Sequence, residues 1–115
     1  MTTYPLEDSV DYDALLTGPR QWYRELPVTL SAGQSIVRGA LLTSSDGVTV
    51  TAVAATTDTV FGIAKEDVDA TDADTDTVVW VSGDFNVEAV DAGDLDASDF
   101  ILAARNVGIL LRSPS

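Results

Sequence analysis

Residues 60–88 read VFGIAKEDVDATDADTDTVVWVSGDFNVE. This stretch holds two apolar runs rich in β-branched residues, 60–64 and 77–81, and the second run continues past Gly83 to Phe85. Because β-branched and aromatic side chains favour extended chain, both runs are predicted to be strands. Glycine permits a bend or a bulge within a strand, so the second strand is expected to bend at Gly83.

Between the two runs lies an acidic segment, residues 65–76, which is predicted to be a long solvated loop. Its six carboxylates are those of Glu66, Asp67, Asp69, Asp72, Asp74 and Asp76. The alternating acids from Asp72 onward resemble the start of an EF-hand loop, which needs glycine at its sixth position and glutamate at its twelfth. Those positions hold Thr77 and Gly83, so no specific metal site is expected.

The chain from residue 26 onward has the pattern of a β domain. Further strands are predicted over residues 27–30, 35–42, 48–52 and 109–111, and Gly39 interrupts the second of them. The Asp46-Gly47 pair favours a tight hairpin turn before residues 48–52. A chain of 115 residues is long enough for one domain with a modest core. Residues 26–115 are therefore predicted to form a single, mainly β domain.

One helix is predicted, over residues 98–106. Asp96 or Ser98 is suited to its N-cap, and Gly108 to the position just beyond its C-terminus. Its buried face is expected to be formed by apolar residues at helical spacing: Phe100, Ile101, Ala104 and Val107.

Residues 1–25 show neither the two-residue period of a strand nor the 3.6-residue period of a helix. Pro5 and the Gly18-Pro19 pair interrupt regular structure. The apolar residues are scattered: Tyr4, Leu6, Val10, Tyr12, Leu15, Leu16, Trp22 and Tyr23. A polar segment with spaced aromatics is typical of an arm that orders against a partner. A frayed terminus, or an arm lying on its own domain, explains the pattern equally well.

The chain contains no histidine and no cysteine. Serine–histidine–aspartate and cysteine–histidine nucleophiles, and zinc sites built from cysteine and histidine, are therefore excluded. Asp84 and Glu88 form an imaginable pair of catalytic carboxylates, but no aromatic-rich cleft or long loop is predicted around them. The sequence thus predicts a protein that is not an enzyme and that uses no cofactor.

The net charge of −13 repels phosphate backbones, so binding to nucleic acid is not expected. No apolar run approaches the roughly 18 residues of a membrane span, and the N-terminus lacks the basic and apolar regions of a secretory signal. Aspartate outnumbers glutamate, and five arginines accompany one lysine. Such a surface suits molar salt, so a halophilic host is one hypothesis, and an acidic surface that serves solubility alone is the other.

Three further features allow more than one interpretation. Residues 33–42 have the glycine spacing of small-barrel lipoyl or biotinyl carriers, which present a modified lysine at a hairpin tip, and Lys65 is the only lysine. A surface or adhesion domain stabilised by cations is another alternative, because of the acidic segment. Trp80 and Phe85 flank the bend at Gly83 and are expected in the core or in a subunit interface, with the core favoured for Trp80.

Three segments follow one another in a recognisable order. Residues 62–71 read GIAKEDVDAT, residues 79–86 read VWVSGDFN, and residues 108–111 read GILL after the predicted helix. This order resembles the lambda-type head decoration protein family of tailed viruses, whose members show G-I-L-x-E-D-V-D-A-T, then V-x-V-x-G-x-F-N, then a short helix leading into G-I-x-L. The resemblance covers roughly residues 28–111. Ala64 stands where the family has a larger apolar residue, and the N-terminal arm does not align.

The resemblance implies a small β-barrel or β-tulip-like domain, residues 26–115, behind a flexible capsid-binding arm, residues 1–25. It implies a homotrimer that binds the major capsid protein at threefold and quasi-threefold positions of a mature, expanded head and stabilises the shell against genome pressure. Its place is the outer surface of the virion, after synthesis in the cytoplasm of a bacterial or archaeal host. Contacts with the capsid are expected from Thr2, Thr3, Tyr4, Pro5, Leu6 and Tyr12, and contacts within the trimer from Trp80 and Phe85.

Overall fold

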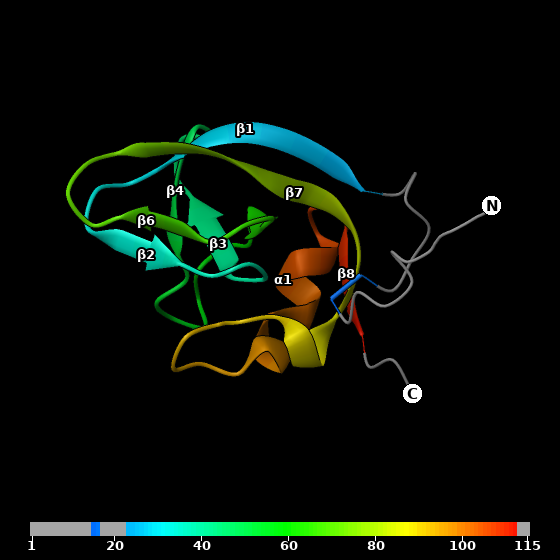
Figure 1. Cartoon of the computed structure of the whole chain (residues 1–115). Coiled ribbons are helices and arrows are strands. Elements are labelled where there is room, and N and C mark those ends of the chain that lie inside the picture. Colours follow the sequence, from blue (N-terminus) through cyan, green and yellow to red (C-terminus); the bar gives the residue numbers. More distant parts are fainter. Residues whose placement is uncertain (1–14, 17–22, 113–115) are drawn as a thin grey trace.

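The computed structural model describes residues 15–16 and 23–112, and it is mainly β, as predicted. A closed five-stranded barrel is formed by β1 (Arg24–Leu30), β3 (Leu41–Ser44), β4 (Thr49–Ala52), β5 (Gly62–Ala64) and β7 (Thr75–Asn86). β8 (Ile109–Arg112) extends the sheet beyond β7, and β2 (Gln34–Ile36) pairs with β6 (Val68–Ala70) in a separate ribbon. Figure 1 shows this ribbon at one end of the molecule, and α1 (Ile101–Arg105) with β8 at the other.

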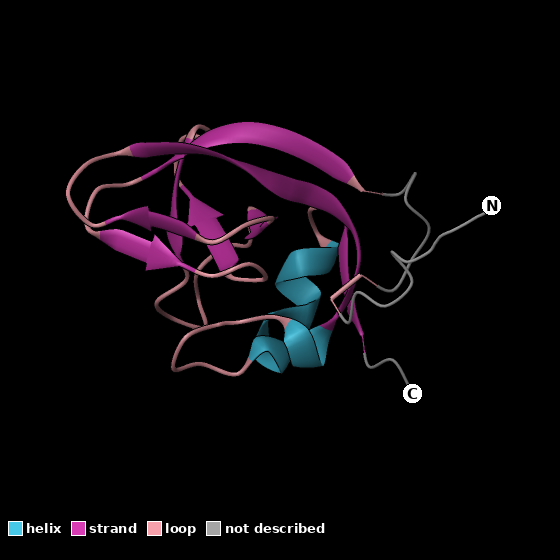
Figure 2. Ribbon diagram, viewed as in Figure 1, coloured by secondary structure: helices cyan, strands magenta, loops and turns pink. Residues whose placement is uncertain are grey.

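The barrel closes because β1 pairs on both of its edges. Thr29 and Leu30, at its end, pair in parallel with β4, and its whole length pairs antiparallel with β7. The remaining pairings, of β3 with β4, β3 with β5 and β5 with β7, are antiparallel. Each of the five strands therefore has a neighbour on both sides, which is how a barrel protects its edges. Figure 2 shows the strands of the barrel arching over the short helical segments.

β7 is the longest strand, and it bends at Gly83, as predicted. The ladder between β1 and β7 skips one β7 residue, Val81, which marks a β-bulge. Gly83 follows with a φ of +140°. Trp80 and Phe85 are an odd number of residues apart and would lie on opposite faces of a regular strand. The bulge and the bend bring both rings into one cluster, with their centroids 5.6 Å apart.

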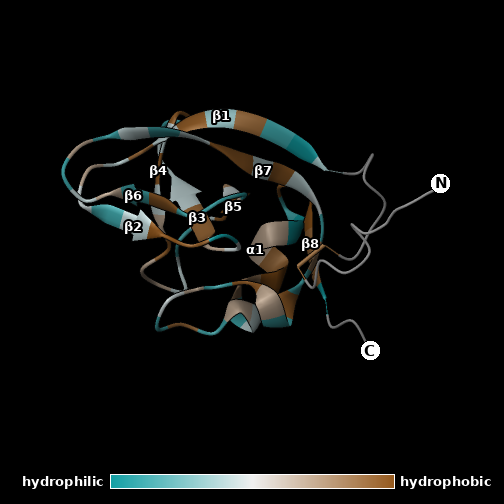
Figure 3. Ribbon diagram, in the orientation of Figure 1, coloured by the Kyte–Doolittle hydropathy of each residue, from teal (hydrophilic) through white to brown (hydrophobic). Residues whose placement is uncertain are grey.

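Two hydrophobic clusters fill the fold. One joins the ribbon to all five strands of the barrel and consists of Val28, Leu30, Ile36, Ala40, Leu42, Val50, Ala64, Val68, Ala70 and Val79. The other lies between the barrel and the helical segments and consists of Leu15, Leu41, Val53, Val60, Ile63, Trp80, Phe85, Val90, Ala92, Ala97, Phe100, Ala104, Ile109 and Leu111. Because β7 supplies Val79 to the first and Trp80 to the second, it joins the two clusters. Figure 3 shows the apolar segments of the strands and of α1.

The predicted helix begins as a 3-10 turn (Ala97–Phe100) and continues as α1. Asp96 is the N-cap, as predicted, since its Oδ1 accepts the N–H of Ser98 at 3.0 Å. Gly108 ends the turn after α1 with a φ of +88°, a value that glycine adopts easily.

The buried face of the helix is smaller than predicted. Phe100 and Ala104 are fully buried, but Ile101 and Val107 are 36% and 44% exposed, so the prediction is wrong for these two residues. A 3-10 turn has three residues per turn instead of 3.6, and α1 lasts only five residues. The helical phase assumed for residues 98–106 therefore does not hold along the whole segment.

The extended piece over residues 35–42 is interrupted at Gly39, as predicted. β2 ends at Ile36, β3 begins at Leu41, and a turn around Gly39 (φ +95°) separates them. The Gly39 N–H donates to the Ala64 carbonyl at 2.9 Å, and the Gly39 carbonyl accepts the Asp91 N–H at 2.9 Å. These long-range bonds hold the chain in the turn.

The acidic segment is not the solvated loop that was expected throughout, because residues 68–70 form β6. Val68 and Ala70 are buried while Asp69 is exposed, which is the alternation of a strand with one covered face. β7 begins at Thr75 and so includes the last residues of the segment. No helix in the described part of the chain is long and apolar enough to cross a membrane.

Candidate functional site

The residues expected to contact a capsid, Thr2, Thr3, Tyr4, Pro5, Leu6 and Tyr12, lie outside the described residues. Leu15 and Leu16, from the same predicted arm, pack on the domain. Leu15 is 3% exposed, and its carbonyl accepts the N–H of Asn86 at 2.8 Å. Leu16 forms an antiparallel bridge with Phe85. For these two residues, the alternative in which the arm lies on its own domain is therefore the one observed.

Tyr23, Trp80 and Phe85 form an aromatic cluster at the bend of β7. The Tyr23 ring lies edge-on to the other two, with centroid distances of 5.3 Å to Phe85 and 6.3 Å to Trp80. Trp80 is 4% exposed and Phe85 is fully buried, so both rings are in the core, which the sequence favoured for Trp80. Little of either ring is left for contact with a second subunit.

Tyr23, just before β1, contacts the bend of β7. Its hydroxyl donates to the carbonyl of Asp84, and its ring covers Gly83 so closely that a Cβ there would lie 2.4 Å from Tyr23 Cδ2. The guanidinium carbon of Arg38 lies 5.3 Å from the Trp80 ring centroid, within range of a cation–π interaction. The sequence analysis missed this role of Tyr23 because it lies in a segment without any period.

Asp84 serves an ion pair and not a catalytic pair with Glu88. Its carboxylate is 2% exposed, and Arg112 donates to both oxygens, from Nε to Oδ1 at 2.9 Å and with Nη2 at 2.8 Å from Oδ2. Such bidentate bonds are among the strongest in proteins, and here they join β8 to β7. Glu88 is exposed in the 3-10 turn Val87–Ala89.

The carboxylates of residues 65–76 hold turns of the backbone. Asp67 Oδ1 accepts the Arg38 N–H at 2.8 Å, and Asp69 Oδ1 accepts the Thr71 N–H at 3.0 Å. The hydroxyl of Thr71, followed by its N–H, holds the pKa of Asp69 below its ordinary value. Across the described residues, no three acidic side chains are grouped so that they would hold a metal ion.

Lys65 lies at the end of β5, in the connection to β6, and its Nζ is 2.8 Å from Glu25 Oε2. Both side chains are close to half exposed, so the ion pair contributes little stability. The connection joins strands of two different sheets and is not the tip of a hairpin, which is the place where carriers present their lysine.

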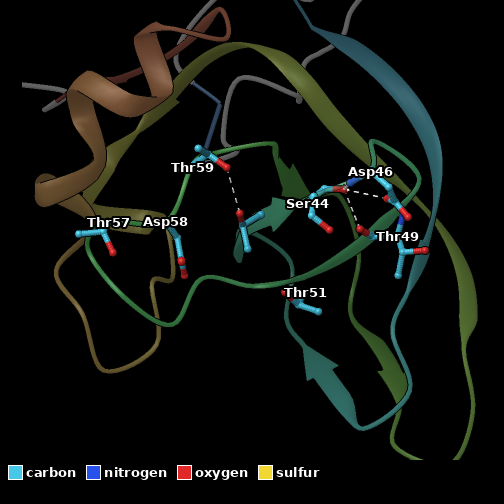
Figure 4. A pocket seen from close by; sticks show the side chains of 9 residues that line it. Ser44, Asp46, Thr49, Thr51, Thr57, Asp58 and Thr59 are labelled. Atoms are coloured by element: carbon cyan, nitrogen blue, oxygen red, sulfur yellow. Dashed lines mark hydrogen bonds between the residues drawn. The ribbon is translucent and has the colours of Figure 1, made fainter.

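A shallow groove of about 620 Å³ is lined entirely by hydroxyl and carboxylate side chains: Thr43, Ser44, Ser45, Asp46, Thr49, Thr51, Thr57, Asp58 and Thr59. Figure 4 shows these residues around the groove. Both carboxylates are engaged by their own loops. Asp46 Oδ1 accepts the N–H groups of Val48 and Thr49, and Asp58 Oδ2 accepts those of Ala54 and Ala55. The groove therefore offers hydroxyl groups but no activated nucleophile.

α1 and the turn after it expose large apolar side chains: Ile101, Leu102 and Val107, of which Leu102 is 73% exposed. Leu110 is also exposed, but it points to the side of β8 that faces away from α1, because its neighbours Ile109 and Leu111 are buried in the cluster that contains Ala104. Large exposed apolar patches are uncommon on monomeric proteins, so the outer side of α1 is a candidate for contact with another protein.

No family model and no curated protein matches the chain. The resemblance to decoration proteins rests on residues 62–71, 79–86 and 108–111.

Proposed function

We propose that the chain is a capsid decoration protein. As a homotrimer, it binds the major capsid protein at threefold and quasi-threefold positions of a mature, expanded head and stabilises the shell against the pressure of the packaged genome. It is a structural protein of the outer surface of the virion, and it acts without catalysis and without a cofactor.

The observation that carries the proposal is the pairing of the segments that resemble the family. Residues 62–71 supply β5 and β6, and residues 79–86 supply the last eight of the twelve residues of β7. β5 and β7 are direct neighbours, with Ile63 opposite Trp80 and Ala64 opposite Val79. Residues 108–111 lie in and just before β8, which pairs with the last residues of β7. β5, β7 and β8 thus lie in one sheet, while β6 belongs to the separate ribbon, and the pairing of these strands supports a shared fold.

The chemistry of the described residues supports a structural role. The buried carboxylate of Asp84 is bound by Arg112, and the carboxylates of Asp46, Asp58 and Asp67 accept backbone N–H groups. A general acid or base needs a side chain that is free to exchange a proton with a substrate. These carboxylates instead hold the fold, which is what a protein that clamps a shell requires.

The attachment of Leu15 to β7 supports a refined boundary for the arm. Residues 1–14 precede this attachment, and they contain all six residues proposed to bind the capsid through backbone strand addition and apolar pockets: Thr2, Thr3, Tyr4, Pro5, Leu6 and Tyr12. Each arm binds weakly because its ordering costs entropy. Three arms on one trimer make the later contacts intramolecular and so raise the overall affinity.

The proposal is tested by mixing the purified protein with undecorated, expanded capsids and measuring bound protein by co-sedimentation. Saturable binding is expected. A variant lacking residues 1–14 keeps Leu15 and Leu16 and is expected to bind much more weakly, while Val48→Ser, a change at an exposed site on the β3–β4 turn, is the matched control. Absence of saturable binding by the full-length protein contradicts the proposal.

Two other measurements distinguish the alternative functions. A carrier would show an adduct on Lys65 in its intact mass. A cation-stabilised surface domain would show saturable Ca²⁺ binding in calorimetry that Mg²⁺ does not reproduce. Either result would replace the decoration function.

A further inference from the structure

The turn between β3 and β4 contains the one Asp-Gly pair of the chain, Asp46-Gly47, and no asparagine in the chain precedes a glycine. Among aspartates, one that is followed by glycine is the most prone to isomerise, because glycine has no side chain to shield its main-chain nitrogen from the neighbouring carboxyl group. Both residues are exposed, so water reaches them freely. The pair is therefore the candidate site for a covalent change of the main chain.

The fold itself requires glycine at this position. Gly47 has a φ of +81°, where residues with a side chain are strained, and an Asp-Gly pair favours the tight turns of hairpins. β3 and β4 pair antiparallel on either side of the turn, with Ser44 opposite Val50. The residue that allows the turn is thus the same residue that leaves the Asp46 carboxyl group open to attack.

The reaction needs no partner other than water. The main-chain nitrogen of Gly47 bonds to the carboxyl carbon of Asp46 and gives up its proton, and one carboxyl oxygen leaves as water, which closes a five-membered succinimide ring. Water then reopens the ring. Breaking the new bond restores aspartate, whereas breaking the original peptide bond gives isoaspartate, in which the main chain runs through the side-chain carbons. The water that was lost is regained, so the composition of the chain is unchanged.

Hydrogen bonds hold both reacting groups in the folded chain. The Gly47 N–H donates to Ser44 Oγ at 2.9 Å. Asp46 Oδ1 accepts the N–H groups of Val48 and Thr49 at 2.9 and 2.8 Å. The Ser44 hydroxyl in turn donates to the Thr49 carbonyl at 2.7 Å, and Figure 4 shows Ser44, Asp46 and Thr49 around this network. Because the carboxyl group must turn toward the Gly47 nitrogen to react, these bonds have to break first.

The same bonds keep the carboxyl group in its less reactive form. Hydrogen bonds, chiefly from the Thr49 N–H, hold the pKa of Asp46 below its ordinary value. An oxygen leaves as water from a protonated carboxyl group much more easily than from a carboxylate. Opening of the turn therefore frees the two reacting groups and also removes this second protection.

Isoaspartate does not fit the folded turn. It adds a carbon atom to the main chain between Asp46 and Gly47 and leaves a carboxylate directly on Cα, so the two N–H groups lose the acceptor that they have now. Thr49 is where β4 begins to pair with β1, opposite Thr29, and this pairing closes the barrel. A change in the turn is thus transmitted to the closure of the barrel.

We propose that Asp46-Gly47 is the site at which this chain is covalently modified with age: Asp46 isomerises to isoaspartate when the β3–β4 turn opens, and the hydrogen bonds of the Ser44 hydroxyl set the rate. The modified turn weakens the closure of the barrel between β1 and β4. This inference does not depend on the proposed function, and capsid binding does not enter its test.

The test incubates full-length protein, folded and in concentrated urea, at the same mildly acidic pH. Isoaspartate at each aspartate is then measured by peptide mapping with electron-transfer fragmentation. Asp46 is expected to be modified before any other aspartate, roughly 10-fold or more slowly in the folded protein than in urea, because the reaction waits for local opening. The isomerised fraction, separated by chromatography, is expected to unfold at a lower urea concentration than the unmodified protein.

Two variants test the role of the serine hydroxyl. Ser44→Ala is expected to isomerise roughly 5- to 30-fold faster than the wild type when folded, because it loses the bonds that hold the turn closed. Ser45→Ala removes a hydroxyl from the same turn that takes part in none of these bonds, and it is expected to match the wild type. In concentrated urea all three proteins are expected to react at one rate, since the turn is then open in each.

A second measurement covers the case in which Ser44→Ala does not fold. Low, sub-denaturing urea opens the turn in the wild type, and isomerisation is expected to rise in proportion to hydrogen exchange at the Val48 and Thr49 amides. Four results overturn the inference: a folded wild type that reacts as fast as the chain in urea, a folded Ser44→Ala no faster than Ser45→Ala, isomerisation that does not follow amide exchange, or another aspartate modified before Asp46. An isomerised protein as stable as the unmodified one overturns the effect on barrel closure.

Discussion

Replacing Gly83 with alanine is expected to destabilise the fold by about 2–6 kcal/mol. The new Cβ would lie 2.4 Å from Tyr23 Cδ2, 2.7 Å from Tyr23 Cε2 and 3.2 Å from Phe85 Cε2. Overpacking of this kind costs about 1–3 kcal/mol, and a side chain held at a positive φ, here +140°, costs a further 1–3 kcal/mol or so. Domains of this size are stable by about 5–15 kcal/mol, so the variant remains measurable.

The two contributions are separated by two further variants. Gly47→Ala changes a glycine with φ +81° and no atom within 4 Å of the new Cβ, so it carries only the backbone cost of about 1–2 kcal/mol. Tyr23→Ala removes the ring that Cβ would meet. In that background, Gly83→Ala is expected to lose most of its overpacking cost.

The measurement is urea unfolding at constant NaCl concentration, followed by the fluorescence of the tryptophans. The reasoning is refuted if Gly83→Ala costs no more than Gly47→Ala. It is equally refuted if Gly83→Ala costs the same with and without the Tyr23 ring.

Three other perturbations have definite expected outcomes. Arg112→Ala is expected to cost about 1–3 kcal/mol in urea unfolding, because it leaves the buried Asp84 carboxylate without two charge-assisted bonds; a cost below the error of the measurement contradicts this. Hydrogen bonds, chiefly from the Thr49 N–H, hold the pKa of Asp46 below 3.8. A carboxyl group whose pKa is lowered by folding stabilises the folded state when the pH is above the pKa of the unfolded state, and this contribution is lost as the pH falls. The free energy of unfolding is therefore expected to decrease below about pH 4, and to decrease less steeply in Asp46→Asn. Asp72→Lys, in the exposed turn before β7, is expected to raise the unfolding midpoint in dilute buffer and to leave it unchanged in molar NaCl, where charges are screened; equal shifts in both buffers would reject the electrostatic explanation.

Local patterns were sufficient to predict most elements of the fold. β-branched alternation placed β4 and β5, and the cap residue Asp96 placed the start of the helical segment. Both signals come from residues that are close together in the sequence, so they can be recognised in a single sequence. Closure of the barrel depends instead on β1 pairing with both β4 and β7, and no local pattern carries the register of strands so far apart.

The error in the acidic segment has the same origin. Residues 68–70 have the composition of an acidic loop, but pairing with β2 makes them a strand. Contacts between distant residues here override the local preference. The interruption of residues 35–42 at Gly39 was predicted, and bonds from Gly39 to Ala64 and Asp91 hold it in place.

The candidate surfaces were predicted less well than the fold. Leu15 and Tyr23 were expected in an arm, yet they cover β7, because aperiodic segments give no sign of what they pack against. Ile101 and Val107 were expected inside, yet they are 36% and 44% exposed. A 3-10 turn changes the phase of the helix that follows it, so different residues face the core. Nothing in the residues marks such a turn in advance.

The continuity of β7 limits how the length of this chain can vary. A single inserted residue in the middle of β7 would turn every following side chain to the opposite face. Val79 or Trp80 would then leave its cluster, and the packing of both clusters would fail together. The exposed turn of residues 71–74, just before β7, has no such constraint, because it lies outside every ladder. Insertions that lengthen the molecule are therefore tolerated at that turn and excluded from the strand that follows it.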